Sequence, residues 1–321
     1  MAKTEVQPAA GAMAATTPEP RRGKLLVIVG SPNVGKSVLF NALTGAYVTV
    51  SNYPGTTVEV SRGHTRFAGE EWAVVDTPGM YALLPSTEEE RVGRRILLRE
   101  APTVTLHVVD AKNLERMLPF TLQLMEAGQP VILVCNIMDE AERRGIRLDV
   151  NALGEALGIP VVPAVSTEGR GVAELRSTIE AYEPGDAGVV VRYGDEIEAA
   201  VAAIVELLPE RPGLSRRALS LLLLQGDEDA VALLDETTAC RAAEIVRECA
   251  RNHSRPLSYV IATRRQQHAA RSAEVALRGP ETRDRTLGER LSDVLITPWS
   301  GVPILLLVLY LGLFKFVGGI G

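Results

Sequence analysis

The sequence predicts an α/β fold with a mostly parallel sheet in its first half, followed by a helical region and one apolar helix near the C-terminus. Short apolar runs alternate with helical patterns, as in a parallel sheet covered on both faces. Helix-breaking residues at 183–188 then interrupt the alternation, and residues 302–320 are almost continuously apolar. The apolar runs of the first half are Leu25–Val29, Trp72–Val75, Val104–Val109, Val131–Val134 and Ile159–Val165.

The first half divides into a tail and a domain. Residues 1–22 are rich in Ala, Pro, Thr and Glu and contain no apolar stretch of signal-peptide length. They are therefore predicted to be a disordered tail and not a targeting signal. The domain is predicted over 23–183. Within it, the turn Phe67–Glu70 predicts an antiparallel hairpin at the sheet edge, and Ser86-Thr87-Glu88-Glu89 is typical of a capping box at a helix start.

The second half is predicted to be helical. Apolar residues recur at helical spacing at Ile197, Val201, Ile204 and Leu208. This pattern predicts a helical domain over 189–290. The final segment approaches the roughly twenty apolar residues that cross a bilayer, and Lys315 lies near its far end. We therefore expect one transmembrane helix at 298–321, with the excess of arginines at 264–290 placing the preceding domains in the cytoplasm.

Composition limits the function classes. A chain of 321 residues allows about two domains. The formal net charge of −6 and the pI near 5.5 argue against a general nucleic-acid binder, so no nucleic-acid partner is expected. The three cysteines lack paired spacing and the four histidines are dispersed. We expect neither a disulfide framework nor a histidine or cysteine metal site.

The segment Gly30-Ser31-Pro32-Asn33-Val34-Gly35-Lys36-Ser37 lies between the first apolar run and a helical pattern, which is the strand–loop–helix context of a P-loop. Its glycines allow backbone N–H groups to converge on a polyphosphate at a helix N-terminus. Lys36 is expected to reach the outer phosphates, and the Ser37 hydroxyl is expected to bind Mg²⁺. The chain is therefore predicted to bind a nucleoside triphosphate.

Two later segments complete a phosphate and magnesium site. The polar loop at 50–59 offers a threonine hydroxyl that can close over Mg²⁺ and the γ-phosphate, and we favour Thr57 over Thr56. The buried strand 72–75 delivers Asp76 toward Mg²⁺, and in the following Thr77-Pro78-Gly79 the Gly79 N–H is expected to contact the γ-phosphate. Met80 follows where a Ras-like enzyme carries the glutamine that orients the attacking water. Hydrolysis here must position its water in another way.

The base is predicted from Asn136-Ile137-Met138-Asp139, which follows an apolar run. Asp139 can accept from guanine N1–H and from the 2-amino group, whereas adenine offers neither in that geometry. Ser166-Thr167-Glu168-Gly169 provides backbone amides that could contact guanine O6, although this sequence alone is common turn chemistry. All five segments in this order predict a guanine-nucleotide site.

These motifs resemble the bacterial ferrous iron transport protein B family. Tyr81 after the Pro-Gly, the run Asp110–Arg116 and Ile137, where most GTPases have lysine, make the match specific. The resemblance covers nearly the whole chain after residue 23. It implies a GTPase domain, a helical domain that steadies bound GDP, and a link to a membrane part. It also implies that Asn33 helps to bind K⁺ beside the phosphates, although Asn33 has a second interpretation as a turn former.

The sequence thus predicts a GTPase that hydrolyses GTP to GDP with Mg²⁺ and K⁺, through Lys36, Asn33, Thr57 and Gly79. We expect it at the bacterial inner membrane, with the GTPase domain on the cytoplasmic face. Because the chain ends at Gly321, where a first membrane helix would finish, the expected partner is a separate membrane permease part or further copies of the chain. Two alternatives stay open: a membrane-tethered regulatory or assembly GTPase unrelated to iron, and a module that binds GTP or GDP with little turnover.

Overall fold

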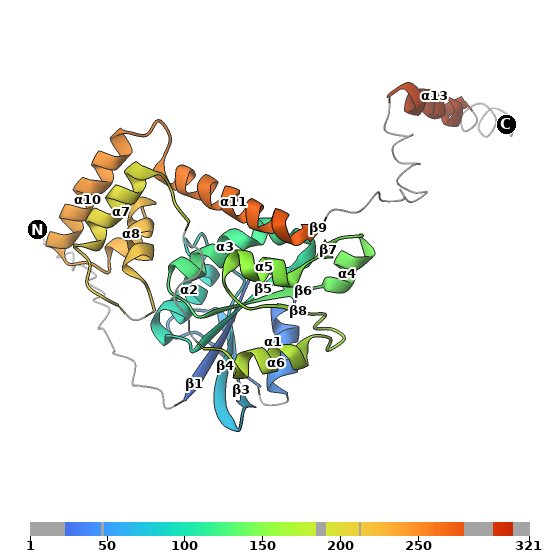
Figure 1. Cartoon of the computed structure of the whole chain (residues 1–321), viewed down its shortest axis with the longest axis horizontal. Coiled ribbons are helices and arrows are strands. Elements are labelled where there is room, and N and C mark those ends of the chain that lie inside the picture. Colours follow the sequence, from blue (N-terminus) through green and yellow to red (C-terminus); the bar gives the residue numbers. More distant parts are fainter. Residues whose placement is uncertain (1–22, 46–47, 184–190, 212, 279–297, 311–321) are drawn as a thin grey trace, which may run out of the picture. The chain divides into compact units, whose positions relative to one another are not determined.

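A computed structural model of the chain describes residues 23–45, 48–183, 191–211, 213–278 and 298–310. The chain separates into two compact units, Met1–Arg278 and Gly279–Gly321, and each is considered by itself (Figure 1). The predicted tail at 1–22, most of the predicted linker and the second part of the predicted membrane helix lie outside the described residues.

The first unit is built on a seven-stranded sheet with the order β2-β3-β4-β1-β5-β6-β8. β1 pairs in parallel with β4 and β5, and β6 pairs in parallel with β5 and β8. The pairs β2–β3 and β3–β4 are antiparallel. These pairings confirm the mostly parallel sheet and the antiparallel hairpin that the sequence predicts, but the edge of the sheet is formed by β2 and not by that hairpin. The strands are β1 (Lys24–Val29), β2 (Val48–Asn52), β3 (Glu59–Phe67), β4 (Glu70–Asp76), β5 (Val104–Asp110), β6 (Val131–Asn136) and β8 (Val161–Pro163).

Helices cover both faces of this sheet, because alternate residues of its central strands point to opposite sides. In β1, Leu26 and Ile28 join the core formed with α1 and α6. Leu25, Val27 and Val29 join a larger core formed with α2, α3 and α5, which continues into the helical region. The helices around the sheet are α1 (Lys36–Thr44), α2 (Glu88–Glu100), α3 (Leu114–Glu126), α4 (Met138–Arg143), α5 (Val150–Leu157) and α6 (Val172–Glu180), with a 3-10 turn η1 (Ala111–Asn113).

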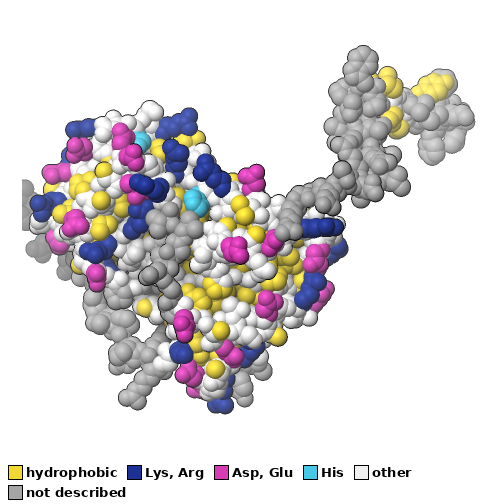
Figure 2. All heavy atoms as spheres, in the orientation of Figure 1, with side chains coloured by type: hydrophobic (Ala, Val, Ile, Leu, Met, Phe, Trp, Pro, Cys, Tyr) yellow, Lys and Arg dark blue, Asp and Glu magenta, His cyan; other side chains and the backbone are white. Residues whose placement is uncertain are grey.

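The helical region follows as the sequence predicts, but its last helix returns to the sheet. α11 packs along α3 and α5 (Figure 1), and its buried face there contains the small residues Ala269, Ala273 and Ala276. β9 (Leu277–Arg278) then pairs with β7 (Arg147–Leu148), and Asp149 N donates to Ala276 O at 2.9 Å. The helices of the region are α7 (Asp195–Val205), α8 (Arg216–Leu224), α9 (Glu228–Val231), α10 (Glu236–Arg251) and α11 (Leu257–Ala276). Basic and acidic side chains are interspersed on the face of this unit shown in Figure 2.

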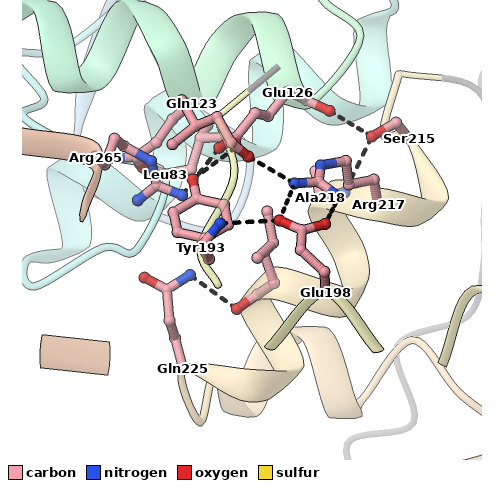
Figure 3. Close-up of polar contacts among 12 residues, drawn as sticks. Leu83, Gln123, Glu126, Tyr193, Glu198, Ser215, Arg217, Ala218, Gln225 and Arg265 are labelled. Carbon is pink, nitrogen blue, oxygen red and sulfur yellow. Dashed lines mark hydrogen bonds and ion pairs between the residues drawn. The ribbon is translucent and has the colours of Figure 1, made fainter. Parts of the chain in front are cut away.

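Buried polar contacts fasten the helical region to α3 (Figure 3). Glu126, at the end of α3, accepts from the Tyr193 hydroxyl at 2.6 Å and from Arg265 Nη2 at 3.0 Å. The guanidinium groups of Arg217 and Arg265 both lie within 6 Å of the Tyr193 ring centroid, at 5.9 and 5.5 Å. Arg217 in turn donates to both carboxylate oxygens of Glu198 at 2.7 and 2.9 Å. The two parts of the unit therefore share a charge network as well as an apolar core.

Three local predictions need correction. The segment at 50–59 is not all loop, because its first residues belong to the edge strand β2 (Val48–Asn52). The last strand of the sheet is shorter than the apolar run that predicts it. The capping box is displaced by one residue, since the N-cap of α2 is Thr87, whose hydroxyl accepts from Glu90 N at 3.2 Å. The Glu90 carboxylate, not that of Glu89, accepts from Ser86 N at 2.7 Å.

The second unit is described only over α13 (Pro298–Leu309) and Tyr310. Three of its described leucine side chains are exposed: Leu305 at 58%, Leu306 at 61% and Leu309 at 46%. Among the described residues, no helix combines the length and the apolar character needed to cross a bilayer. The predicted transmembrane helix at 298–321 is therefore not confirmed.

Candidate nucleotide-binding site

The loop between β1 and α1 has a backbone that only particular residues can adopt. Gly30 and Gly35 both have positive φ, at 147° and 88°. A Cβ at Gly30 would collide with the carbonyl oxygen of Val108, and one at Gly35 would collide with the Asn136 amide. The loop therefore lies tightly between the ends of β5 and β6, with its N–H groups at the start of α1. This is the arrangement that binds phosphate at a helix N-terminus.

Lys36 is held over this loop. Its Nζ donates to Ser31 O at 3.0 Å, and the residue is buried. Burial lowers the pKa of Lys36, and the nearby carboxylate of Asp76 opposes that shift. A buried ammonium with one carbonyl partner is a cation available to phosphate oxygens.

A hydroxyl and a carboxylate meet beside the loop. Ser37 Oγ donates to Asp76 Oδ2 at 2.7 Å. The other carboxylate oxygen, Oδ1, is buried and accepts no hydrogen bond from the described residues. Burial raises the pKa of Asp76, while the Ser37 hydrogen bond and Lys36 lower it. Such a buried oxygen without a partner is costly unless a cation or donor satisfies it, and hard oxygen ligands of this type fit Mg²⁺.

The segment after β4 lies directly against the loop. Thr77 donates to Ile28 O through its N–H at 3.1 Å and through its hydroxyl at 2.9 Å. A Cβ at Gly79 would lie 2.6 Å from the Pro32 ring, so only glycine allows this approach. Pro78 and Gly79 also line a pocket of about 640 Å³ together with Thr57. The structure therefore brings the predicted phosphate, magnesium and threonine segments to one place.

The two threonines of the preceding loop differ in their contacts. Thr56 Oγ1 donates to Tyr53 O at 2.9 Å and accepts from Val58 N at 3.3 Å, so it closes its own turn. Thr57 is exposed and faces the pocket. Met80 is fully buried, with its sulfur beside Gly93 of α2. Its side chain therefore cannot orient a water molecule in the pocket.

The base-reading segment follows β6. Asn136 Nδ2 donates to Val34 O at 2.8 Å, and Asn136 Oδ1 accepts from Ser166 N at 3.0 Å and Ser166 Oγ at 2.9 Å. Asn136 therefore ties the P-loop to the loop after β8, in which Thr167 is exposed. Ile137 has a left-handed backbone and forms the N-cap of α4, and Met138 N donates to Ala164 O at 3.2 Å. Asp139 follows, on the first turn of α4.

Charged residues that motif analysis does not single out surround α4. Arg143 contacts the Asp139 carboxylate, and this hydrogen bond is the main cause that lowers the pKa of Asp139. Lys112 contacts Glu140, and Arg170 contacts Glu142. Lys112 falls within the run Asp110–Arg116 that carries part of the resemblance, yet nothing in its spacing indicates that it lies beside the base-reading segment.

A phosphate-binding loop at the carboxyl end of β1, a carboxylate beside it at the end of β4, and an Asn-x-x-Asp at the end of β6 together define a P-loop GTPase of the guanine-nucleotide class. The family models refine this assignment. Residues 24–179 match "Ferrous iron transport protein B", and residues 193–278 match the "FeoB cytosolic helical domain". The chain belongs to the ferrous iron transport protein B family and contains its GTPase domain and its cytosolic helical domain.

Individual relatives agree with this membership. The Fe(2+) transporter FeoB of Escherichia coli strain K12 is 33% identical over 289 residues, which are 88% of this chain and 37% of that protein. The chain thus spans little more than a third of the length of this curated relative. A GDP-bound mutant of the S. thermophilus FeoB G-domain is 31% identical with a TM-score of 0.73, covering 79% of this chain and 100% of that one. The cytosolic domain of the T. maritima FeoB iron transporter in its GMPPNP form is 29% identical, with a TM-score of 0.67. This match covers 80% of this chain and 100% of that one.

Proposed function

We propose that the first unit binds GTP and GDP with Mg²⁺ and hydrolyses GTP as the nucleotide-controlled cytosolic part of a ferrous iron transport system. The Ser37–Asp76 pair carries this proposal, because it places a hydroxyl and a buried, partly unsatisfied carboxylate beside a phosphate-binding loop. The comparisons do not favour a regulatory or assembly GTPase unrelated to iron.

Each segment has one role in this proposal. The amides of 30–35 and the Lys36 ammonium bind the phosphates, while Ser37, Thr57 and Asp76 hold Mg²⁺. Bound Mg²⁺ supplies positive charge that neutralises the phosphate oxygens. The Gly79 N–H contacts the γ-phosphate, and the adjoining Thr77 and Pro78 hold Gly79 in place. Thr56 shapes the loop that carries Thr57. At the base, 136–139 bind guanine through Asp139, and the amides of Ser166 and Thr167 contact O6.

The membrane and partner assignments are also proposals. We infer a GTPase domain at 23–183, a helical domain at 189–290 and a membrane helix at 298–321, which would hold the first two on the cytoplasmic face of the bacterial inner membrane. The family-model ranges and the exposed Leu305, Leu306 and Leu309 of α13 support this division. The chain would then act with a membrane permease part or with further copies of itself.

Hydrolysis by this chain should be faster in KCl than in NaCl at equal ionic strength. Asn33 is exposed, has φ 64°, and makes no side-chain hydrogen bond with the described residues, so its oxygen is free to help bind K⁺ beside the phosphates. Positive charge at that point matters, since an arginine finger contributes about 10³ to 10⁵ in rate in other GTPases. Phosphate release from GTP by the full chain in the two salts measures the difference.

Two Asn33 variants separate the ion site from loop shaping. Asn33→Gly keeps the left-handed backbone without a side chain, and Asn33→Ala also removes the side chain but disfavours that backbone. Both variants should lose the potassium effect, and Asn33→Gly should keep GDP binding nearly intact. Equal wild-type rates in KCl and NaCl would leave Asn33 as a loop-shaping residue.

The full chain should stay with membranes after a carbonate wash. Nineteen mainly apolar residues at 302–320 are close to the length of about twenty that spans a bilayer. A chain that ends at Ser292 should instead be found in the soluble fraction and still bind GDP. Fractionation followed by immunoblotting measures both, and release of the full chain by carbonate would show that 298–321 is not a membrane helix.

A further inference from the structure

Helix α4 (Met138–Arg143) carries the predicted base-reading residue Asp139, but it is only six residues long. A helix of this length is not stable by itself in water. Its entry is also strained, because Ile137 has φ 61° and ψ 34°, and this left-handed conformation is a genuine outlier for a β-branched residue. Strain of this kind persists only where the surrounding structure imposes it. The position of Asp139 therefore depends on contacts from outside α4.

Within the described residues, two ion pairs supply such contacts from outside α4, and a third pair lies inside the helix. Arg143 pairs with Asp139 inside the helix, Lys112 of η1 pairs with Glu140, and Arg170 of the loop after β8 pairs with Glu142. The side chains of Arg143 and Arg170 are 70% and 50% exposed, and pairs so exposed to water contribute little. In the Lys112–Glu140 pair, the Lys112 side chain is only 12% exposed, whereas that of Glu140 is 43% exposed. Of these three cations Lys112 is the least exposed to water, so its pair is the one expected to hold α4 most strongly.

Lys112 connects α4 to the central sheet. Its Nζ contacts Glu140 Oε2 and lies 3.7 Å from Asp110 Oδ2, at the end of β5. Asp110 is itself fixed, because its carboxylate accepts from Lys112 N and Asn113 Nδ2, both at 2.9 Å. The hydrogen bond from Lys112 is the main cause that lowers the pKa of Glu140. One ammonium thus joins a carboxylate on the sheet to the carboxylate next in sequence to Asp139.

We propose that Lys112 is a positioning residue that determines guanine specificity: through Glu140 it fixes α4 so that both oxygens of Asp139 face N1–H and the 2-amino group of the base. This inference rests on the proposed guanine site. Two hydrogen bonds from one carboxylate demand a defined orientation, and a small displacement of the helix would weaken one of them before the other. Without the ammonium, Asp110 and Glu140 would also repel each other and move α4 away from the sheet.

The test compares GDP with inosine diphosphate, which lacks the 2-amino group. The measured ratio is the dissociation constant of inosine diphosphate divided by that of GDP, both obtained by competition with labelled GDP on the full chain. A larger ratio means that Asp139 binds the 2-amino group more strongly. Lys112→Met keeps the aliphatic stem and removes the charge. It should lower the ratio about tenfold, the size expected for weakening one hydrogen bond to a charged group. Lys112→Arg should restore most of the ratio.

Matched variants exclude a general effect on stability. Lys24→Met removes a lysine whose ion pair with Glu70 is exposed and lies at the amino-terminal end of β1, the end of the parallel strands opposite to Asp110, and it should leave the ratio unchanged. Glu140→Gln removes the negative charge that pairs with Lys112, and it should lower the ratio as Lys112→Met does. Adding Lys112→Met to Asp139→Asn should lower the ratio no further.

The outcomes separate the inference from the proposed function. Absence of GDP binding by the wild-type chain would reject the guanine site itself. A wild-type chain that prefers GDP over inosine diphosphate, with the same preference after Lys112→Met and Glu140→Gln, would reject the role of Lys112 and leave the guanine site standing. Equal weakening of both nucleotides would reject it too, since that pattern indicates a merely structural contact.

Discussion

Asp139→Asn should change the base preference of this chain from guanine to xanthine nucleotides. The carboxylate is positioned to accept from two N–H groups of guanine, and an asparagine would present a donor where one acceptor is needed. Hydrogen bonds to charged groups contribute about 1.5–3 kcal/mol each, so losing one and turning the other into a weaker neutral hydrogen bond should weaken GDP binding by about 10 to 10³. Xanthine carries a carbonyl at the 2-position, which can accept from the new amide. Competition of labelled GDP and labelled XDP with GDP, XDP and ADP measures the change.

The control must account for the ion pair that Asp139→Asn also removes. Arg143→Gln removes the cation that contacts Asp139 but keeps the carboxylate, so it should preserve the guanine preference. Because the Arg143 side chain is mostly exposed, GDP binding should weaken far less than in Asp139→Asn. Displacement of GDP by ADP as effective as by GDP in the wild-type chain would remove the guanine assignment.

The elements that the sequence predicts well are those whose local pattern carries their structure. β1, the P-loop and α1 are consecutive, and an apolar run, two glycines and a helical pattern specify them without long-range information. β2 lacks such a signal, since Val48–Asn52 are all exposed. It forms because the edge of β3 offers unpaired backbone groups. The choice between Ser86 and Thr87 as N-cap likewise depends on where the Glu90 carboxylate points.

The return of α11 to the sheet was not predictable, because it depends on surfaces more than a hundred residues apart. Small buried residues of α11 meet α3 and α5 there, and helical periodicity alone does not indicate which partner a helix covers. In the candidate site, motifs located the phosphate, magnesium and base segments but not the contacts between them. Asn136 binding Val34 O, Met80 buried beneath α2 and Lys112 beside Glu140 are all consequences of tertiary packing.

The buried network between α3 and the helical region is a place where a single substitution should strongly lower stability. Glu126 and Arg265 have side chains only 3% and 5% exposed. Burial raises the pKa of Tyr193, which donates to Glu126 and therefore stays protonated. One helical turn earlier on α3, Gln123 Oε1 accepts from Leu83 N at 2.8 Å, shortly after the Asp76–Gly79 segment. Helix α3 thus contacts the helical region through Glu126 and the chain that follows Asp76–Gly79 through Gln123.

Glu126→Ala should lower the free energy of unfolding by about 3–5 kcal/mol, because removing one partner leaves Arg265 buried without a counter-charge. Urea denaturation of a chain ending at Ser292 measures this loss of unfolding free energy. Trp72 is the one tryptophan of that chain, so its fluorescence follows the unfolding. As a control, Glu70→Ala removes the exposed partner of Lys24 and should cost less than about 1 kcal/mol. A loss no larger for Glu126→Ala than for Glu70→Ala would show that water reaches the network and screens its charges.

The double variant Glu126→Ala with Arg265→Met distinguishes an unpaired charge from lost packing. If the cost of Glu126→Ala is mainly the uncompensated guanidinium, replacing Arg265 by an apolar side chain of similar length should recover a large part of the stability, as when a buried ion pair is replaced by apolar residues. Additive losses would instead indicate that each side chain contributes through its own contacts. Since Tyr193 then loses both its acceptor and one stacked cation, incomplete recovery is expected, and Tyr193→Phe in the double variant should restore part of the remainder by removing the orphaned hydroxyl.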